Sequence, residues 1–174
     1  MYLPISDVKL TQINSGAKGS IFVGTERYGS HRPSSYVVVD GGRLVQSKLA
    51  LGLSGNGAFT ANRLGPGELL YGLELPHAEL VELELGDTKT TPFNGTLKPG
   101  QLLVTTGSAY LGITWFHTDM PEFALVNLQT WTLESYVSLM NSDVNTALLV
   151  DWELVHRHQD QTMVLATPAA ALTR

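Results

Sequence analysis

The stretch "ELVELEL", residues 79–85, indicates the fold of this chain because apolar and acidic residues alternate in it. Its odd-numbered residues from Val81 to Leu85 are apolar, whereas Glu82 and Glu84 are charged. Successive side chains of a β-strand point to opposite faces, so one face of such a strand is buried and the other is wet. We interpret the acidic face as a solvated surface whose charges discourage edge pairing, and not as a cation site.

The same alternation recurs from one end of the chain to the other, separated by turn signals such as "SGNG" and "KPG". A chain of 174 residues is long enough for one domain with a substantial core. We therefore predict a single all-β domain over residues 1–174, a sandwich or barrel of about ten strands. The candidate strands are 2–10, 20–24, 35–40, 43–51, 68–75, 79–85, 101–106, 110–117, 123–131, 146–156 and 161–167.

One segment departs from the period of two. In "TLESYVSLMNSD" the apolar residues from Leu133 to Met140 fall at i, i+3, i+4 and i+7, which is a helical spacing. Thr132 suits the N-cap position and Asn141 suits the end of a helix. The sequence thus predicts one short helix near residues 132–141.

A weak internal similarity is also present. "LGPGELL" (64–70) and "LKPGQLL" (97–103) share a Pro-Gly turn that leads into an apolar run, and each follows a phenylalanine. Two similar entries into a strand are consistent with a duplicated β-unit, although Pro-Gly before a strand is common.

The composition favours a protein that is partly covered by a partner. Charged residues make up only 16% of the chain, below the roughly 25% typical of soluble domains. Large polar, weakly charged surfaces are common at subunit interfaces, so we expect self-association into a homo-oligomer.

Other classes receive little support from the composition. The net charge is −5 and no basic run is present, which argues against nucleic-acid binding. The sequence has no cysteine, no recognisable signal peptide and no apolar stretch long enough to span a membrane. We therefore expect no membrane partner and take the cytoplasm as the default location.

The chemistry that the sequence offers concerns two pairs of residues at strand exits. His156 and His158 in "DWELVHRHQD" continue the face of Trp152, and His117 and Asp119 in "TWFHTD" continue the face of Trp115 in the same way. Residues i and i+2 share a face of a strand, which is the spacing that a strand-borne metal site requires.

The two pairs meet only under one topology. If 110–117, 123–131 and 146–156 are neighbouring antiparallel strands, both exits lie at one end of a sheet. His117, Asp119, His156 and His158 would then suit Zn, Mn or Fe, whose open coordination position activates water or chelates a substrate. This alternative function is a metal-dependent enzyme acting on a small molecule.

The competing interpretation is that these are ordinary loop or core-edge histidines, and it is the stronger one. Cupins provide a useful standard, because their sites combine a strand-borne His-x-His with a following Glu. Here His-x-His comes last in the chain and no Glu follows at a suitable spacing. We therefore predict no cofactor, and no catalytic set of the chain's own.

A second candidate site lies in the longest irregular stretch, "GTERYGSHRPSS" at residues 24–35. It carries Arg27, Tyr28, His31 and Arg32, and an aromatic ring beside guanidinium groups can bind a glycan or an acidic small molecule. An ordinary surface loop is the simpler interpretation.

Three functions follow from the sequence. The first is a binding or assembly module without catalysis, and the second is the metal-dependent enzyme. The third is a carrier that holds an apolar ligand inside a barrel, with Trp115, Trp131 and Trp152 near its lining.

Overall fold

The computed structural model confirms that the chain is built from β-strands, and the described residues contain no helix. The described residues are 9–13, 16–25, 33–55, 57–64, 71–75, 81–86, 98–105, 107–117, 119–135, 147–149, 151–158 and 160–168. The strands are β1 (Lys9–Gln12), β2 (Ile21–Thr25), β3 (Pro33–Asp40), β4 (Lys48–Gly52), β5 (Thr60–Arg63), β6 (Tyr71–Glu74), β7 (Val81–Leu85), β8 (Leu102–Val104), β9 (Ala109–His117), β10 (Met120–Asn127), β11 (Thr132–Glu134), β12 (Ala147–Leu149), β13 (Trp152–His158) and β14 (Gln161–Ala166).

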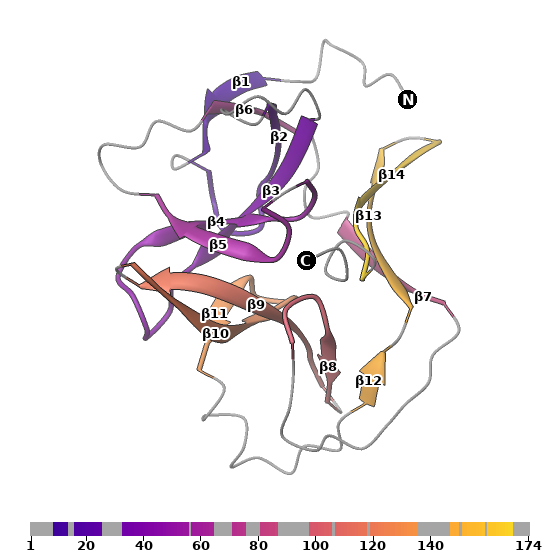
Figure 1. The fold of residues 1–174 in the computed structure, drawn as a ribbon. Coiled ribbons are helices and arrows are strands. Elements are labelled where there is room, and N and C mark those ends of the chain that lie inside the picture. Colours follow the sequence, from indigo (N-terminus) through magenta and orange to yellow (C-terminus); the bar gives the residue numbers. More distant parts are fainter. Residues whose placement is uncertain are drawn as a thin grey trace.

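Six of these strands close into a barrel, in the order β3-β4-β5-β9-β10-β11 and back to β3 (Figure 1). The barrel consists of two antiparallel three-stranded meanders, β3-β4-β5 and β9-β10-β11. The meanders are joined by two parallel pairings, β5 with β9 and β11 with β3. Strands β2, β6 and β1 extend the sheet beyond β3, and β8 and β12 extend it beyond β9.

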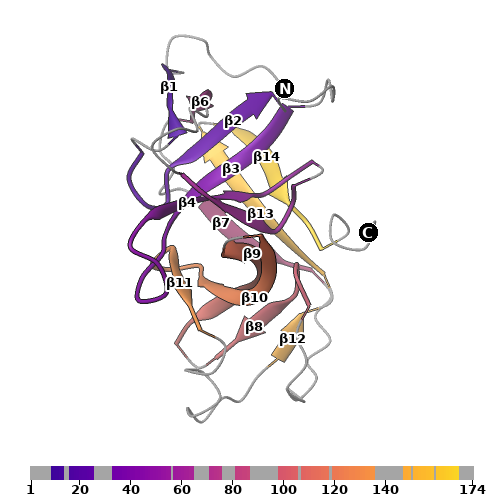
Figure 2. The same cartoon turned by 60° about the vertical axis from the view of Figure 1, so that its left-hand side comes forward.

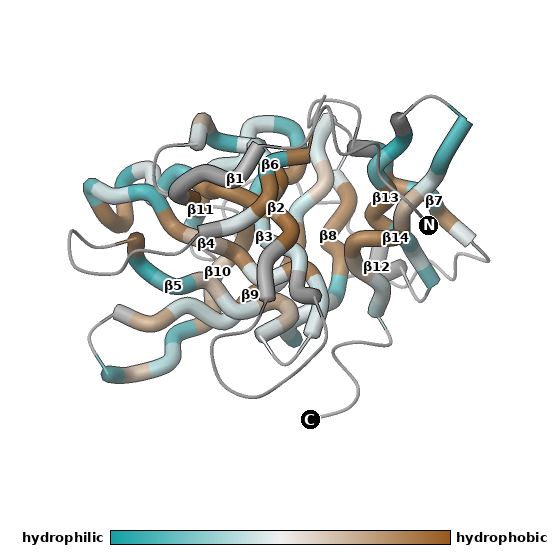
Figure 3. The backbone as a smooth tube through the Cα atoms, turned by 90° about the horizontal axis from the view of Figure 1, so that it is seen from above, coloured by the Kyte–Doolittle hydropathy of each residue, from teal (hydrophilic) through white to brown (hydrophobic). Residues whose placement is uncertain are grey.

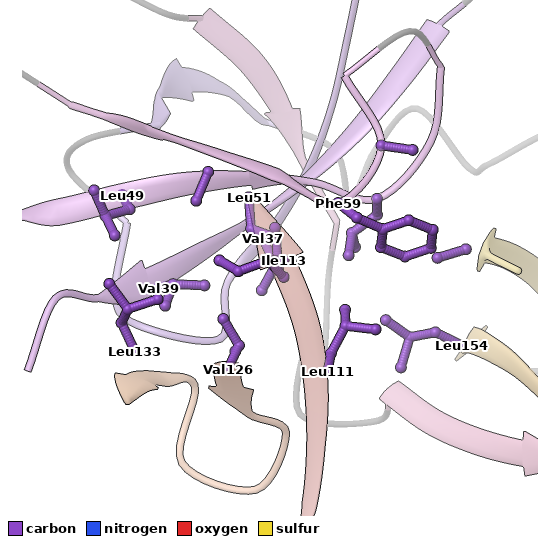
Figure 4. Packing of buried hydrophobic residues seen from close by; sticks show 14 of the residues in the cluster. Val37, Val39, Leu49, Leu51, Phe59, Leu111, Ile113, Val126, Leu133 and Leu154 are labelled. Atoms are coloured by element: carbon purple, nitrogen blue, oxygen red, sulfur yellow. The ribbon is translucent and has the colours of Figure 1, made fainter. Parts of the chain in front are cut away.

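Apolar side chains fill the inside of the barrel (Figure 4). A barrel of this size has room only for side chains, because interior width grows with strand number and even eight strands are just filled. The barrel residues of this core are Val37, Val39, Leu49, Leu51, Ala61, Leu111, Ile113, Trp115, Ala124, Val126 and Leu133. Figure 3 shows hydrophobic residues on the central strands β2, β8 and β13, and hydrophilic residues toward the outer ends.

A separate three-stranded sheet, in the order β14-β13-β7, packs against one end of the barrel (Figures 1 and 2). We call it the cap sheet. Trp152 of β13 is buried, its ring lies 5.7 Å from the ring of Phe59, and its Nε1 donates a hydrogen bond to Gly100 O at 3.2 Å. Ser35 of β3 donates through Oγ to Leu165 O at 3.3 Å. The cap sheet and the barrel therefore share one hydrophobic core.

The fold repeats itself. Strands β2 to β7 match strands β8 to β13 one for one, and matched strands pair with matched partners in the same sense. The registers agree as well. The pair Val37–Leu51 in β3–β4 corresponds to Leu111–Val126 in β9–β10, and Ile21–Val37 in β2–β3 corresponds to Leu102–Leu111 in β8–β9. Likewise, Thr60–Thr114 in β5–β9 corresponds to Thr132–Asp40 in β11–β3.

The last two matched strands, β7 and β13, pair with each other. The antiparallel register places Leu83 opposite Leu154, with Trp152 opposite Leu85 and His156 opposite Val81. This pairing is isologous, because exchanging the two strands reproduces the same set of contacts. The chain is therefore a tandem of two β-units, residues 17–85 and 98–156, related by an approximate two-fold axis along the barrel.

The turns that lead into β2 and β8 repeat in detail. Gly19 N donates to Val38 O at 2.7 Å, and Gly100 N donates to Gly112 O at 2.8 Å. Both glycines adopt the left-handed conformation, with φ of 85° and 86°. Only glycine adopts this conformation without a steric penalty, so each unit keeps a glycine at this position.

Each unit also places an aromatic residue in the left-handed conformation immediately before its third meander strand. These residues are Phe59 (φ 58°) and Trp131 (φ 51°), a rare conformation for bulky side chains. It directs their carbonyl groups across the parallel pairings. The hydrogen bonds are Phe59 N to Gly52 O (2.7 Å) and Thr114 N to Phe59 O (2.9 Å) in one unit, and Trp131 N to Asn127 O (2.8 Å) and Asp40 N to Trp131 O (2.9 Å) in the other.

Two sequence expectations need correction. The helix near 132–141 does not begin at Thr132, because Thr132–Glu134 forms β11 and Leu133 points into the barrel core; residues 136–141 lie outside the described residues. A duplicated unit is present, and its equivalent segments are 17–22 and 98–103; residues 65–70 and 97 lie outside the described residues. Leu64 directly follows β5, whereas residues 98–101 lead into β8.

We expect Gly19→Ala and Gly100→Ala to destabilise the protein in parallel. A left-handed alanine costs about 1–2 kcal/mol. Gly19→Ala should cost more, because its Cβ would lie 2.8 Å from Trp131 Cδ1. Urea denaturation measures both effects, with Gly107→Ala as the matched control, since nothing lies within 4 Å of its Cβ position. An effect at only one of the two sites would contradict the equivalence of the turns.

Trp152 should hold the cap sheet and the barrel together as one cooperative unit. We expect Trp152→Ala to cost about 3–5 kcal/mol through the cavity it leaves. Trp152→Phe should cost less, about 1–3 kcal/mol, chiefly because Gly100 O loses its donor. Both variants should melt in a single calorimetric transition, and a separate early transition in Trp152→Ala would show that the cap sheet folds independently.

Candidate functional site at the distal end of the barrel

The residues of the predicted metal site occupy two different sheets. His117 is the last residue of β9 in the barrel, and Asp119 is exposed in the tip between β9 and β10. His156 and His158 belong to β13 in the cap sheet, where His156 is 1% exposed. The topology under which the two pairs would meet is therefore not the one observed, because β13 pairs with β7 and β14.

The end of β9, with His117, is far along the barrel from the cap sheet, which carries His156 and His158. Leu111 of β9 lies close to Leu154 of the cap sheet (Figure 4), and His117 lies six residues farther along the strand. An extended strand rises about 3.3 Å per residue, so this is about 20 Å. In Figure 1 the end of β9 and the turn between β13 and β14 lie on opposite sides of the molecule. A shared ion needs ligand distances of about 2.1 Å, and this backbone arrangement does not bring the two pairs together.

The other predicted site residues give no assembled site within the described chain. Among described side chains, no three His, Asp or Glu residues gather closely enough to hold a metal ion. The side chains of His117 and His158 are not described, and Arg27, Tyr28, His31 and Arg32 lie outside the described residues. Trp115 and Trp152 are buried in the core and Trp131 packs against it, so the tryptophans serve packing.

The end of the barrel away from the cap sheet, which we call the distal end, carries a different kind of surface. It is formed by the turn 41–47 between β3 and β4, the end of β5, and the tip between β9 and β10. Three large apolar side chains are exposed here, Leu44 (38%), Phe116 (37%) and Met120 (68%).

Charges at the distal end are divided between the two units. The first unit contributes Arg43, Lys48 and Arg63 and the single carboxylate of Asp40; Lys48 Nζ donates to Gly16 O and Asp40 Oδ1 accepts from Gly42 N, each at 2.7 Å. The second unit contributes acidic residues from the β9–β10 tip and β11. These described acidic residues are Asp119, Glu122 and Glu134. One rim of the distal end is therefore basic and the opposite rim is acidic.

A cavity of about 400 Å³ opens between the turn 41–47 and β11. Its lining residues are Gly42, Arg43, Leu44, Thr132, Leu133, Glu134 and Ser135. Gly42 makes this arrangement possible, because it has φ of 61° and a Cβ there would lie 2.8 Å from Leu133 O. The glycine lets the turn lie directly against β11.

Glu134 at this cavity is oriented by a buried amide. Asn127 is 6% exposed, and its Oδ1 accepts hydrogen bonds from Gln129 N and Thr130 N at 2.9 and 3.2 Å. This leaves its Nδ2 to donate to Glu134 Oε1 at 3.4 Å. Arg43 is exposed on the opposite wall and makes no ion pair with any described carboxylate.

The sequence did not single out this cavity. Glu134 falls within the predicted helix near 132–141, and Gly41 and Gly42 lie between the candidate strands 35–40 and 43–51. The consecutive glycines were the available signal, since one of them marks a close backbone approach.

Comparisons of the chain with family models, curated proteins and solved structures find no significant match. Among the described residues, no helix has the length and apolar character needed to cross a bilayer.

We expect His117→Ala and His158→Ala to act independently in metal titrations. The backbone separates the two positions, so no single ion should depend on both. The measurement is the change in Tm of each variant and of the wild type on adding ZnCl₂. A zinc-dependent stabilisation that is abolished in both single variants would show that the pairs do share an ion.

Proposed function

We propose that the protein is a non-catalytic binding or assembly module that forms a homodimer through the distal end of its barrel. The observation that carries this proposal is the exposure of Leu44, Phe116 and Met120 at that end. Exposed apolar residues that gather with a polar rim are typical of protein interfaces.

The charge distribution favours a second copy of the chain as the partner. A two-fold dimer brings each surface patch onto the same patch of its partner in the opposite orientation. The basic rim with Arg43 and Arg63 then faces the partner's acidic rim with Asp119 and Glu122. Such complementarity contributes to orientation and association rate more than to affinity.

The opposite end of the barrel is covered by the cap sheet. Phe59, Trp152 and Leu154 are buried between the cap sheet and the barrel, and the large apolar side chains exposed on the described cap sheet are Leu85 and Val164. The low charge of the whole chain, 16%, agrees with a surface that is partly covered in an assembly. We retain the cytoplasm as the expected location.

Light scattering coupled to size exclusion tests this proposal. We expect a dimeric wild type and a monomeric Leu44→Ser/Met120→Ser variant. The matched control is Leu85→Ser/Val164→Ser, which alters side chains that are 51% and 49% exposed on the cap sheet. It should remain dimeric.

Two results would contradict the proposed dimer. One is a wild type that stays monomeric at about millimolar concentration, since a functional homodimer should have a Kd below that range. The other is a control variant that dissociates while Leu44→Ser/Met120→Ser does not, which would place the interface on the cap sheet.

A further inference from the structure

The internal repeat separates what the fold requires from what it does not. A feature needed to build each unit occurs in both, as with Gly19 and Gly100, or with Phe59 and Trp131. Features that occur in only one unit are free of that requirement. The cavity between the turn 41–47 and β11 is built from such unmatched features.

The pair Asn127 and Glu134 is the first of these. By register their equivalents in the first unit are Gly52 and Asn62. Gly52 cannot be replaced there, because a Cβ would lie 2.1 Å from Gly57 O. The second unit instead has a buried asparagine at this position, and the amide of that residue holds a carboxylate at the cavity wall.

The turn 41–47 is the second unmatched feature. The equivalent connection in the second unit extends as a regular hairpin, in which His117 pairs with Met120 and Trp115 with Glu122. The first unit forms a broader turn that uses Gly42 to approach β11 and carries Arg43 and Leu44 to the cavity. The cavity is therefore lined by Arg43 and Leu44 from the turn on one wall and by Glu134 from β11 on the other.

This combination defines a ligand class. A guanidinium binds a carboxylate through paired hydrogen bonds, and a carboxylate held by an amide binds an ammonium group. Leu44, which is 38% exposed, offers apolar contact beside these charges. About 400 Å³ is within the range of small-molecule sites and exceeds what one amino acid needs.

We propose that this cavity binds a small zwitterion of the α-amino-acid type with an apolar side chain. Arg43 receives its carboxylate, Glu134 receives its ammonium group, and Leu44 contacts its side chain. Asn127 is a positioning residue that acts through Glu134. Every residue of the site comes from one chain, although Arg43 and Leu44 also belong to the surface of the proposed dimer.

Isothermal titration calorimetry with L-leucine tests the site, with N-acetyl-L-leucine and L-leucine amide as matched probes. The first derivative lacks the ammonium group and the second lacks the carboxylate. We expect L-leucine to bind and each derivative to bind at least about tenfold more weakly, since each leaves one charged side chain of the site unpaired.

Variants assign the contacts. Arg43→Gln and Glu134→Gln should each weaken L-leucine binding at least about tenfold. L-leucine amide has no carboxylate for Arg43 to bind, so Arg43→Gln should bind the amide as weakly as the wild type does. Arg63→Gln is the matched control, an exposed arginine at the same end of the barrel that does not line the cavity, and it should bind like the wild type.

Three outcomes would overturn the proposal. They are the absence of binding to L-leucine at millimolar concentration, equal binding of N-acetyl-L-leucine, or an equal loss in Arg63→Gln. Repeating the titration with Met120→Ser, which leaves the cavity lining intact, separates this result from the dimer once light scattering has established the oligomeric state of that variant. Binding retained by a monomeric variant supports the site whatever the state of assembly.

Discussion

The parallel pairing between the two meanders is the constraint on which the rest of the structure depends. A three-stranded meander leaves the outer edges of its first and third strands unpaired, and each unpaired edge exposes backbone donors and acceptors. In this chain each meander pairs with part of both edges of the other, at Thr60–Thr114 and at Thr132–Asp40, while β2 and β8 pair with the remaining outer edges of β3 and β9. Closure of the barrel removes these edges, and the enclosed apolar side chains form the core.

This closure needs a strained residue in each unit. The carbonyl before β5 and the carbonyl before β11 must point across to the other meander, which requires the left-handed conformation at Phe59 and Trp131. Strain of this kind costs roughly 1–3 kcal/mol per residue. Burial of an aromatic side chain contributes a similar amount, roughly 1.5–3 kcal/mol, and Phe59 is 1% exposed. Burial of the Phe59 ring therefore offsets the strain in the first unit, and partial burial of Trp131 against the core contributes to the same end in the second.

These requirements explain which parts of the fold the sequence could predict. The period of two located β3, β7, β9 and β14 well, because each is long enough to show alternation. It missed β5 and β11, which have three or four residues and one core side chain each, Ala61 and Leu133. Such strands exist because two meanders meet, so no local pattern records them. Leu133 has a helical spacing to later apolar residues in the sequence, yet it belongs to strand β11.

The duplication shows the same limit. "LGPGELL" and "LKPGQLL" resemble each other through Pro-Gly turn chemistry, which recurs before many strands. The true equivalents, residues 17–22 and 98–103, agree in backbone hydrogen bonds and in the left-handed glycine, while most side chains differ. Local alternation correctly placed His117 beyond Trp115 and His156 beyond Trp152. It could not show that β9 belongs to the barrel, as β3 does, and that β13 belongs to the cap sheet, as β7 does. The histidines do not meet because these two strands lie in different sheets.

A tandem of two similar units also limits where a function can develop. In the cap sheet, β7 and β13 pair across the two-fold axis at one end of the barrel, and any change there must keep their isologous register. His156 stands where the other unit has Leu85, and it is buried within that register. At the distal end no such pairing joins the two units, so the turn 41–47 and the β9–β10 hairpin differ in length and charge without affecting closure. The fold thus leaves the distal end free to diverge, which is why a cavity with Arg43 on one wall and Glu134 on the other can exist there.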